Sequence, residues 1–412
     1  MHIDVNNAFL SWSAIDLLNK GSKYDIRNSY AVIGGDEKAR RGIVLAKSNS
    51  AKKMGIVTAE TLYSAKKKCP ALRIYPPNFE FYHLMSNRLF EILHKYTSDI
   101  EVASIDECYM DYGKIKRLQG NEIEFAYKVQ KEIFDTLGFT VNIGIANNKL
   151  CAKMASDFSK PFKVHTLYQN EIKEKMHPLP VGDLFGVGKK TAAVLKEMGI
   201  NTIGDLANCD LLELQKRFKN QALHLINIAN GIDNSEVISY KTDPKCISTS
   251  STLPIDAKRV NEILPLLREQ AEKIGLELRK ENKYAYVIAA ICKNKDFQNS
   301  SKQTKLANPT NISKEIFEIA SKLMEQIWDK NGVRLVGIRV SSLVSNYYYQ
   351  VSFFDNKEIS KKEKDETLEK TIDKLKEKYG INKINKGVWL AFKLLFWYNR
   401  LVSRRIYEHR IN

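Results

Sequence analysis

The first 167 residues alternate between short apolar runs and longer stretches in which apolar residues recur every three or four positions. The opening "HIDV" is a short strand-like run, and "AFLSWSAIDLLNKG" follows with helical spacing that stops at Gly21. The same reading gives strands and helices in alternation as far as residue 161. The predicted strands are 30–35, 41–49, a pair within 100–113, and 140–146; the predicted helices are 48–56, 81–96, 122–138 and 148–161. Strands separated by helices predict one mixed sheet with helices on a face.

From about residue 168 the pattern changes to short helices interrupted by Gly186-Val187-Gly188 and Gly199, which predicts an all-helical unit. Residues 231–245 are polar, contain Pro244 and lack periodicity, so we expect a linker. A second α/β pattern follows, and after residue 345 the chain becomes first charged and helical and then aromatic. The elements predicted there are helices 260–280 and 313–330, strands 284–293 and 334–344, a charged helix 361–380 and an aromatic-rich end 386–412.

Length and charge narrow the class of protein. The 412 residues suffice for two to four domains, at about 100–200 residues each. Lys and Arg number 65 against 48 Asp and Glu, a net charge of +17, which favours a polyanionic partner such as nucleic acid or an anionic membrane surface over a merely basic soluble protein. The six cysteines form no C-x-x-C pair or metal-ligand cluster, and no signal peptide or membrane-length apolar run is visible. We therefore expect a reduced cytoplasmic protein without structural zinc.

Two neighbouring acids stand out in "ASIDECYMDYG". In an ideal strand Asp106 and Glu107 point to opposite faces, whereas a tight connection between "EVASI" and "CYMDY" could aim both the same way. With Asp4 at another strand end they form a candidate set of three carboxylates, the hard oxygen ligands that Mg²⁺ prefers. Such a set suits two-metal phosphoryl transfer. The alternative is an ordinary hairpin turn, where Asp is common, although repelling carboxylates beside apolar strands favour a shared cation.

Four motifs in series carry a family resemblance: "HIDVNNAF", "ASIDECYMD", "VNIGIANNKLCAKMASDFSKP" and "LFGVGKKTAAVLKEMGINTIGDLA". In this order and at these distances the chain resembles the Y-family, lesion-bypass DNA polymerases of the bacterial DNA polymerase IV group, over roughly residues 1–345. The resemblance implies an error-prone translesion enzyme of DNA repair and the SOS response, with a multidomain α/β and α right-hand fold. Its implied parts are a palm (1–10 and 78–167), fingers (11–77), a helical thumb (168–232), a linker (233–245), an α/β little finger (246–343) and a C-terminal tail (344–412).

The same resemblance implies roles for single residues at the active site. Asp4 and Asp106 match the family's metal-bridging aspartates, Glu107 matches the third carboxylate, and the carbonyl of Val5 completes the shell of two Mg²⁺ ions. Phe9 matches the aromatic steric gate that rejects a ribose 2′-hydroxyl; otherwise it is a core residue of its helix.

Lysines would bind the nucleotide. Lys160 matches a family lysine that contacts the triphosphate. Ser48–Lys52 lacks the tyrosine and arginine of the family's S-Y-x-x-R pattern, so Asn49 and Lys52 stand at those positions. A lysine cannot reproduce the bidentate fork of an arginine, and nucleotide binding is expected to differ there. An exposed lysine that is merely solvated is the alternative.

Binding of DNA and of a sliding clamp rests on other segments. "FGVGKK" has the form of a helix-hairpin-helix, in which Gly186, Gly188, Lys189 and Lys190 would hold a backbone phosphate; a plain packing turn is the alternative. The 246–343 unit would grip the DNA backbone and contains no candidate catalytic cluster. "QVSFFD" resembles a clamp-binding peptide with Gln350, Phe353 and Phe354 as anchors. The aromatic end has no assigned counterpart and could bind a partner or dock on the chain itself.

We therefore predict a monomeric DNA-directed DNA polymerase that uses primer–template DNA, deoxynucleoside triphosphates and a sliding clamp (β subunit). Two alternatives remain open at this point. One is a clamp-associated DNA-binding factor that kept the fold but lost catalysis, and it predicts DNA affinity without nucleotide incorporation. The other is a different palm enzyme such as a nucleotide cyclase, which has no need of a helix-hairpin-helix or a basic surface.

Overall fold

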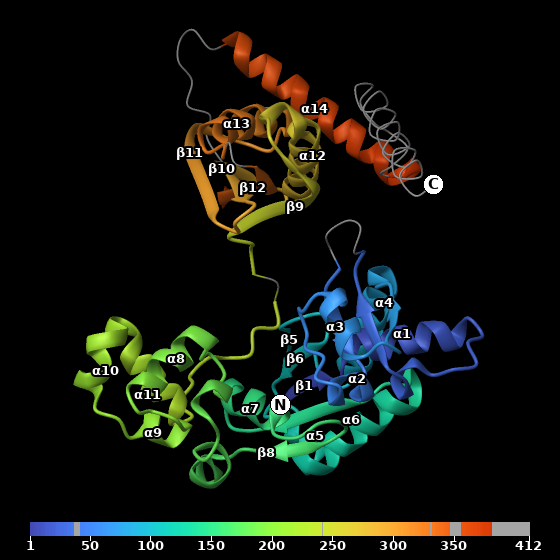
Figure 1. The fold of residues 1–412 in the computed structure, drawn as a ribbon, viewed down its shortest axis with the longest axis vertical. Helices are drawn as coiled ribbons and strands as arrows, with labels where there is room; N and C mark the ends of the chain where they lie inside the picture. Colours follow the sequence, from blue (N-terminus) through green and yellow to red (C-terminus); the bar gives the residue numbers. More distant parts are fainter. Residues whose placement is uncertain (37–41, 241, 330–331, 347–355, 381–412) are drawn as a thin grey trace. The chain divides into compact units, whose positions relative to one another are not determined.

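The computed structural model describes residues 1–36, 42–240, 242–329, 332–346 and 356–380 (Figure 1). They form two compact units: the first takes the described residues up to 240, and the second takes those from Thr242 onward. Within these residues, no helix combines the length and the apolar character needed to cross a membrane.

A five-stranded mixed sheet in the order β5-β6-β1-β7-β8 is the centre of the first unit. Its strands are β1 (His2–Val5), β5 (Ile100–Val102), β6 (Glu107–Met110), β7 (Val141–Ile145) and β8 (Val164–Thr166). All neighbours are antiparallel except β7 and β8. The predicted mixed sheet is therefore confirmed.

Two faces of this sheet are chemically different. Ile3, Val5 and their apolar neighbours on β6 and β7 pack in one core with helices α4 (Phe79–His94) and α6 (Glu122–Leu137). The other face is closed by helix α7 (Lys149–Asp157), which approaches β7 so closely that a Cβ on Gly144 would lie 2.0 Å from the Ala152 carbonyl oxygen. The glycine therefore permits this helix-to-strand contact.

A smaller sheet in the order β3-β2-β4 lies between α1 and α4 in the sequence. It is built from β2 (Ala31–Gly34), β3 (Val44–Lys47) and β4 (Arg73–Tyr75), with helices α1 (Ala8–Asn19), α2 (Asn49–Lys53) and α3 (Leu62–Lys68). One side packs with α2 and α3 around Val32 and Leu62, and the other with α1 around Leu10 and Ile33. Gly55, with φ of +74°, follows α2 as expected for the end of a short helix.

The all-helical region predicted after residue 168 is also present. Its α-helices are α8 (Lys189–Glu197), α9 (Ile203–Ala207), α10 (Leu211–Phe218) and α11 (Ala222–Ala229). The short helix α5 (Lys116–Gln119) lies earlier, between β6 and α6 in the sequence. The apolar core of the helical region takes in Leu150, Cys151 and Met154 from α7. Helix α7 thus packs both on the mixed sheet and in the helical core.

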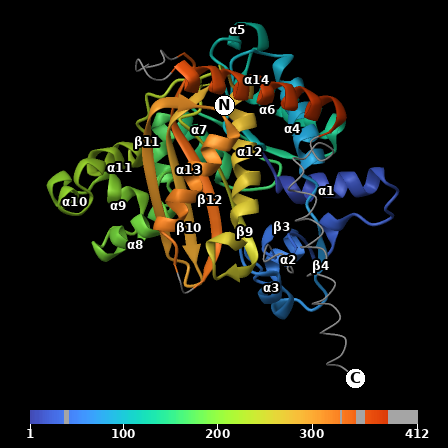
Figure 2. The ribbon, with the colours of Figure 1, turned by 90° about the horizontal axis from the view of Figure 1, so that it is seen from above.

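The second unit is a four-stranded antiparallel sheet in the order β11-β10-β12-β9, with helices α12 (Leu264–Lys280) and α13 (Ser313–Gln326) over one face (Figure 2). The strands are β9 (Cys246–Ala257), β10 (Tyr284–Asn294), β11 (Asn299–Thr310) and β12 (Val333–Val344). The long helix α14 (Asn356–Tyr379) follows. Strands β9 and β11 had not been predicted, because their polar sequences carry little apolar periodicity and depend on pairing with β12 and β10.

Candidate active site

Strand alternation gathers the acids on the polar face of the mixed sheet. Asp4 is the register partner of Glu107 on β6 and of Asn142 on β7, so these three residues share the face that α7 covers. Ile3 and Val5 point to the apolar core on the opposite face. Asp4 and Glu107, which are about a hundred positions apart in sequence, are therefore neighbours across two strands.

Asp106 does not follow the alternation of side chains along a strand, because it lies in the turn that precedes β6. The backbone N–H groups of Ala103 and Ser104 both donate to the carbonyl of Glu107, at 3.0 and 3.1 Å, which closes a tight connection between β5 and β6. The Val5 N–H donates to the Asp106 carbonyl at 3.0 Å, and the Ser104 hydroxyl donates to Asp106 Oδ1 at 2.6 Å. The predicted tight connection is thus confirmed, and it sets Asp106 beside the end of β1.

Two lysines neutralise the acids. Lys153 of α7 places Nζ 2.7 Å from Glu107 Oε2 and 4.0 Å from Asp4 Oδ1. Lys160, a predicted site residue, donates to Asp4 Oδ2 and lies 2.8 Å from Asp157 Oδ1. Sequence reasoning missed Lys153; the signal was its position in the third motif, four residues before Asp157 on the same helical face.

These contacts shift the pKa values of the groups involved. His2, whose Nε2 lies 3.4 Å from Glu107 Oε2, and then Lys153 lower the pKa of Glu107 to about 2, so this carboxylate is ionised at neutral pH. Burial raises the pKa of Asp4, against the opposing charge of Lys160. Burial lowers the pKa of Lys153, but its hydrogen bond to Glu107 and the nearby aspartates outweigh this effect, and the net shift is upward.

The donor chemistry fits a hard divalent cation. Carboxylates and a backbone carbonyl at Val5 are the ligand types Mg²⁺ takes, and Glu107 is already deprotonated. Asp4 and Glu107 pair with lysine ammonium groups, and in the described part of the chain no three His, Cys, Asp or Glu side chains are grouped as ligands. The two lysines supply the positive charge beside these two acids.

Phe9, in the first turn of α1, is half-buried and lies in a cluster of rings. It stacks on Tyr82 with centroids 4.8 Å apart and an interplanar angle of 13°, and it meets Phe79 edge-on at 6.0 Å. Its ring also touches both the core of the mixed sheet and the core under the small sheet. The aromatic support holds the ring at a defined angle.

Asn49 and Lys52 lie exposed on the short helix α2. Ser48 is the N-cap of this helix, and its side chain accepts from the N–H of Ala51 at 3.1 Å. Lys47, just before the cap, has its pKa lowered by burial and then by the charge of Lys52. The two cations therefore face a common region, which supplies concentrated positive charge without the fork of an arginine.

The glycine turn lies where the motif requires it. Gly186 has φ of +95°, and Gly188 is the N-cap of α8 with no side chain to bond the first N–H groups. Lys189 and Lys190 are exposed in the first turn of that helix. The N–H groups and the two lysines thus surround one helix N-terminus, a suitable arrangement for a phosphate.

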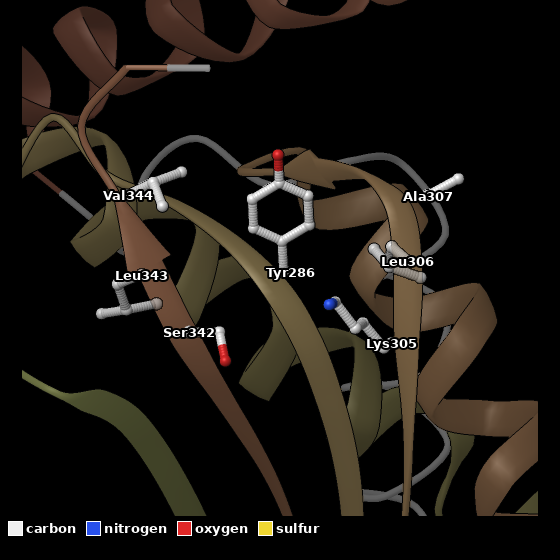
Figure 3. A pocket seen from close by; sticks show the side chains of 7 residues that line it. All are labelled: Tyr286, Lys305, Leu306, Ala307, Ser342, Leu343 and Val344. Atoms are coloured by element: carbon white, nitrogen blue, oxygen red, sulfur yellow. The ribbon is translucent and has the colours of Figure 1, made fainter. Parts of the chain in front are cut away.

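The second unit contains a recess at one end of its sheet (Figure 3). It is lined by Tyr286, Lys305, Leu306, Ala307, Ser342, Leu343 and Val344. No acidic side chain is among the residues that line it. The clamp-peptide residues Gln350, Phe353 and Phe354, and the aromatic end 386–412, lie outside the described residues.

Comparison with known proteins defines the class. The impB/mucB/samB family model matches residues 3–157, its C-terminal domain matches 244–353, and the helix-hairpin-helix motif of the IMS family matches 169–200. Among solved structures, a Y-family DNA polymerase chimera of Dbh and Dpo4 aligns with a TM-score of 0.73 and 26% identity, over 84% of this chain and 99% of that one. An insertion ternary complex of Dbh DNA polymerase aligns with a TM-score of 0.56 and 25% identity over the same shares. The protein is a Y-family DNA polymerase with palm, thumb and little-finger parts.

Curated relatives narrow this class. DNA polymerase IV of Clostridium acetobutylicum is 45% identical over 390 residues, 94% of this chain and 97% of the relative. DNA polymerase IV 1 of Bacillus subtilis is 35% identical over 394 residues, 94% and 92% of the two chains. The chain belongs to the impB/mucB/samB family, in its bacterial DNA polymerase IV group, and is a translesion DNA polymerase that depends on a divalent metal. The predicted family, fold and enzyme class are confirmed, and the nucleotide cyclase alternative is excluded.

Proposed function

We propose that the chain extends a primer 3′-end on template DNA with deoxynucleoside triphosphates, through two Mg²⁺ ions held by Asp4, Asp106, Glu107 and the Val5 carbonyl. When bound, such ions supply Lewis-acid activation of the primer hydroxyl and neutralise charge on the phosphates. The observation that carries the proposal is twofold: Asp4 and Glu107 are register partners on one polar face, and the Asp106 carbonyl accepts from the Val5 N–H at the end of β1.

Each acid has a distinct part in this scheme. Asp4 and Asp106, from the end of β1 and the adjoining turn, would be ligands shared by the ions. Glu107 would be the third carboxylate ligand, and its low pKa keeps it ionised at neutral pH. Lys160, which contacts Asp4 and Asp157, would bind the triphosphate with its ammonium group.

Sugar selection and triphosphate binding involve the neighbouring helices. Phe9 acts as the steric gate, because a ring stacked on Tyr82 cannot move aside for a ribose 2′-hydroxyl. Asn49 and Lys52 attend the triphosphate from α2 as exposed, point-charge contacts.

DNA is held outside the catalytic centre. Gly186, Gly188, Lys189 and Lys190 grip a phosphate irrespective of base sequence. The palm takes residues 1–10 and 78–167, the fingers 11–77, the thumb 168–232 and the little finger 246–343. The little finger adds contacts to the DNA backbone. Gln350, Phe353 and Phe354 dock a monomeric enzyme on the β sliding clamp in the cytoplasm.

Primer extension by the purified full chain tests the proposal. Asp106→Asn keeps the size of the side chain but removes its charge, and we expect incorporation to fall by about 100- to 1,000-fold, the order seen when one charge-stabilising group is lost. Asp111→Asn, four residues past Glu107 in the same hairpin, is the matched control and should retain activity. DNA affinity should be unchanged in both variants.

Two outcomes would overturn the proposal. Asp106→Asn with wild-type extension would remove Asp106 from the site. A wild-type chain that binds primer–template DNA but adds no nucleotide would instead identify the catalytically inactive clamp-associated factor.

A further inference from the structure

Helix α14 lies beyond every segment that the family models match, since the last of these ends at residue 353. It runs along the helical side of the second unit (Figure 1). Its contacts there are polar: Arg279 of α12, whose side chain is only 5% exposed, binds Asp373 at 2.5 Å and Glu369 at 3.1 Å. Further contacts join Glu366 to Tyr284 at 2.8 Å, Glu369 to Ser313 at 3.0 Å and Lys376 to Glu272 at 3.4 Å. The helix is therefore attached by its charged side.

The apolar side of α14 is turned to solvent. Leu368, Leu375 and Tyr379 are 56%, 41% and 52% exposed. They are spaced seven and four residues apart, so at about 100° per residue they fall in one row. The attached residues Glu366, Glu369, Asp373 and Lys376 lie roughly 120° round the helix from this row. We call Leu368, Leu375 and Tyr379 the apolar row.

This arrangement is the reverse of an ordinary surface helix, which buries its apolar stripe and exposes its charges. Single exposed leucines need no explanation, but several in one row on a helix mark a contact surface. Because buried ion pairs already fix the other side of α14, the helix cannot simply rotate its apolar row inward.

The part of the chain that follows α14 has the matching chemistry. Gly380, with φ of +95° and open space around the position of a Cβ, comes directly after Tyr379 and allows the chain to reverse. Six polar or aliphatic residues, 381–386, separate it from "GVWLAFKLLFWY", which is apolar at ten positions and interrupted by Lys393.

We propose that the apolar row of α14 is the docking surface for the chain's own aromatic segment, residues 387–398. The short connection gives that segment an effective concentration of order millimolar at the row, which a separate molecule would have to exceed. A second copy of α14 would offer only three such side chains, whereas the aromatic segment offers ten. Docking also removes a segment of high aggregation tendency from solvent.

Hydrogen exchange on the full chain tests this proposal. Leu368→Lys with Leu375→Lys changes two exposed residues, so the second unit should still fold. We expect amide exchange across 388–398 to become about tenfold faster or more, because the segment loses its binding surface. Phe392→Ser with Leu395→Ser, made in the segment, should speed exchange across 368–379 in return.

The control is Leu212→Lys on α10, where a leucine is 69% exposed in the first unit, and it should leave exchange in 388–398 unchanged. Primer extension should remain intact in all variants, because none touches the acids.

Three results would overturn the proposal. Unchanged amide exchange across 388–398 in the Leu368→Lys, Leu375→Lys variant would show that the segment does not dock on the apolar row. A wild-type dimer, seen by light scattering, that becomes monomeric in the same variant would identify a second copy as the occupant. Loss of binding to anionic phosphatidylglycerol vesicles, with exchange unchanged, would identify a lipid surface.

Discussion

Lysine side chains neutralise two of the three acids. Lys153 pairs with Glu107 and Lys160 pairs with Asp4, which offsets the repulsion that unpaired carboxylates would suffer. Glu107 is ionised at neutral pH because its pKa is about 2.

At Phe9 a smaller side chain should relax sugar selection. Phe9→Ala removes the ring that stacks on Tyr82, and the free energy that excludes one extra hydroxyl is of the order of 1–3 kcal/mol. We therefore expect ribonucleotide incorporation relative to deoxynucleotide incorporation to rise about 5- to 150-fold. Single-nucleotide incorporation kinetics, with a ribonucleotide and the matching deoxynucleotide as substrates, measures this ratio. An unchanged ratio would assign Phe9 to the aromatic core alone.

Tyr96 supplies a pH dependence far from the acids. Burial, and then its hydrogen bond to Glu132, raises the pKa of Tyr96 to about 12. An unfolded tyrosine ionises near 10 while the folded one stays neutral, so the native state loses stability as the pH rises from about 10 towards 12. Tyr96→Phe should make that decline shallower. Tyr109 and Tyr168 share the upward shift, so the decline should not vanish.

Urea unfolding at pH 9 and at pH 11 measures this effect. The difference in unfolding free energy between the two values should be smaller in Tyr96→Phe than in wild type. Equal differences in the variant and in the wild type would show that Tyr96 does not contribute to the loss of stability at high pH.

Among the elements, the linker is attached for much of its length. Glu101 of β5 and Lys149 of α7 form a pair with both carboxylate oxygens 2.7 Å from Nζ, and Glu101 also accepts the N–H of Ile238 at 2.8 Å. Asp233 accepts the N–H of Leu150 at 3.1 Å. On the other side, Lys283 holds Asp243 at 2.5 Å. Only the few residues from 239 to 242 lie between these attachments.

Glu101→Gln should release the linker from the first unit. A hydrogen bond to a charged group contributes about 1.5–3 kcal/mol, so amide exchange at Ile238 should accelerate about tenfold or more. Asp135→Asn, which breaks the exposed Lys131–Asp135 pair on α6, should leave that amide unaffected. Equal exchange in Glu101→Gln and wild type would mean that the linker is held without Glu101.

For the whole molecule, the net charge of +17 governs binding to DNA. Each lysine that contacts a phosphate contributes about 0.9 to the slope of log affinity against log salt. Lys189→Ala with Lys190→Ala should therefore reduce that slope by about 2 with little change in sequence preference. Anisotropy titrations on primer–template DNA at several salt concentrations measure it. The exposed Lys131→Ala on α6 is the control, and a double variant that keeps the wild-type slope would remove the glycine turn from the DNA contacts.

Much of this protein was readable in the sequence. Helices α4, α6, α12 and α13 and strands β2, β7, β10 and β12 followed from apolar periodicity, and the order of four motifs identified the family and the acids. Local spacing is sufficient for these features because each depends on neighbours within a few turns of the chain. The polar strands β9 and β11 could not be predicted in this way, since their strand conformation depends on pairing with β12 and β10.

Only the tertiary structure decided which residues from distant parts of the chain contact one another. The pairing of Lys153 with Glu107, of Lys160 with Asp4 and of Glu101 with the linker joins residues 46, 156 and 137 positions apart. The charged side of α14 is its attached side only because Arg279 is buried opposite it. No periodic pattern encodes these contacts, because they arise when separate elements pack and each buried charge must find a partner.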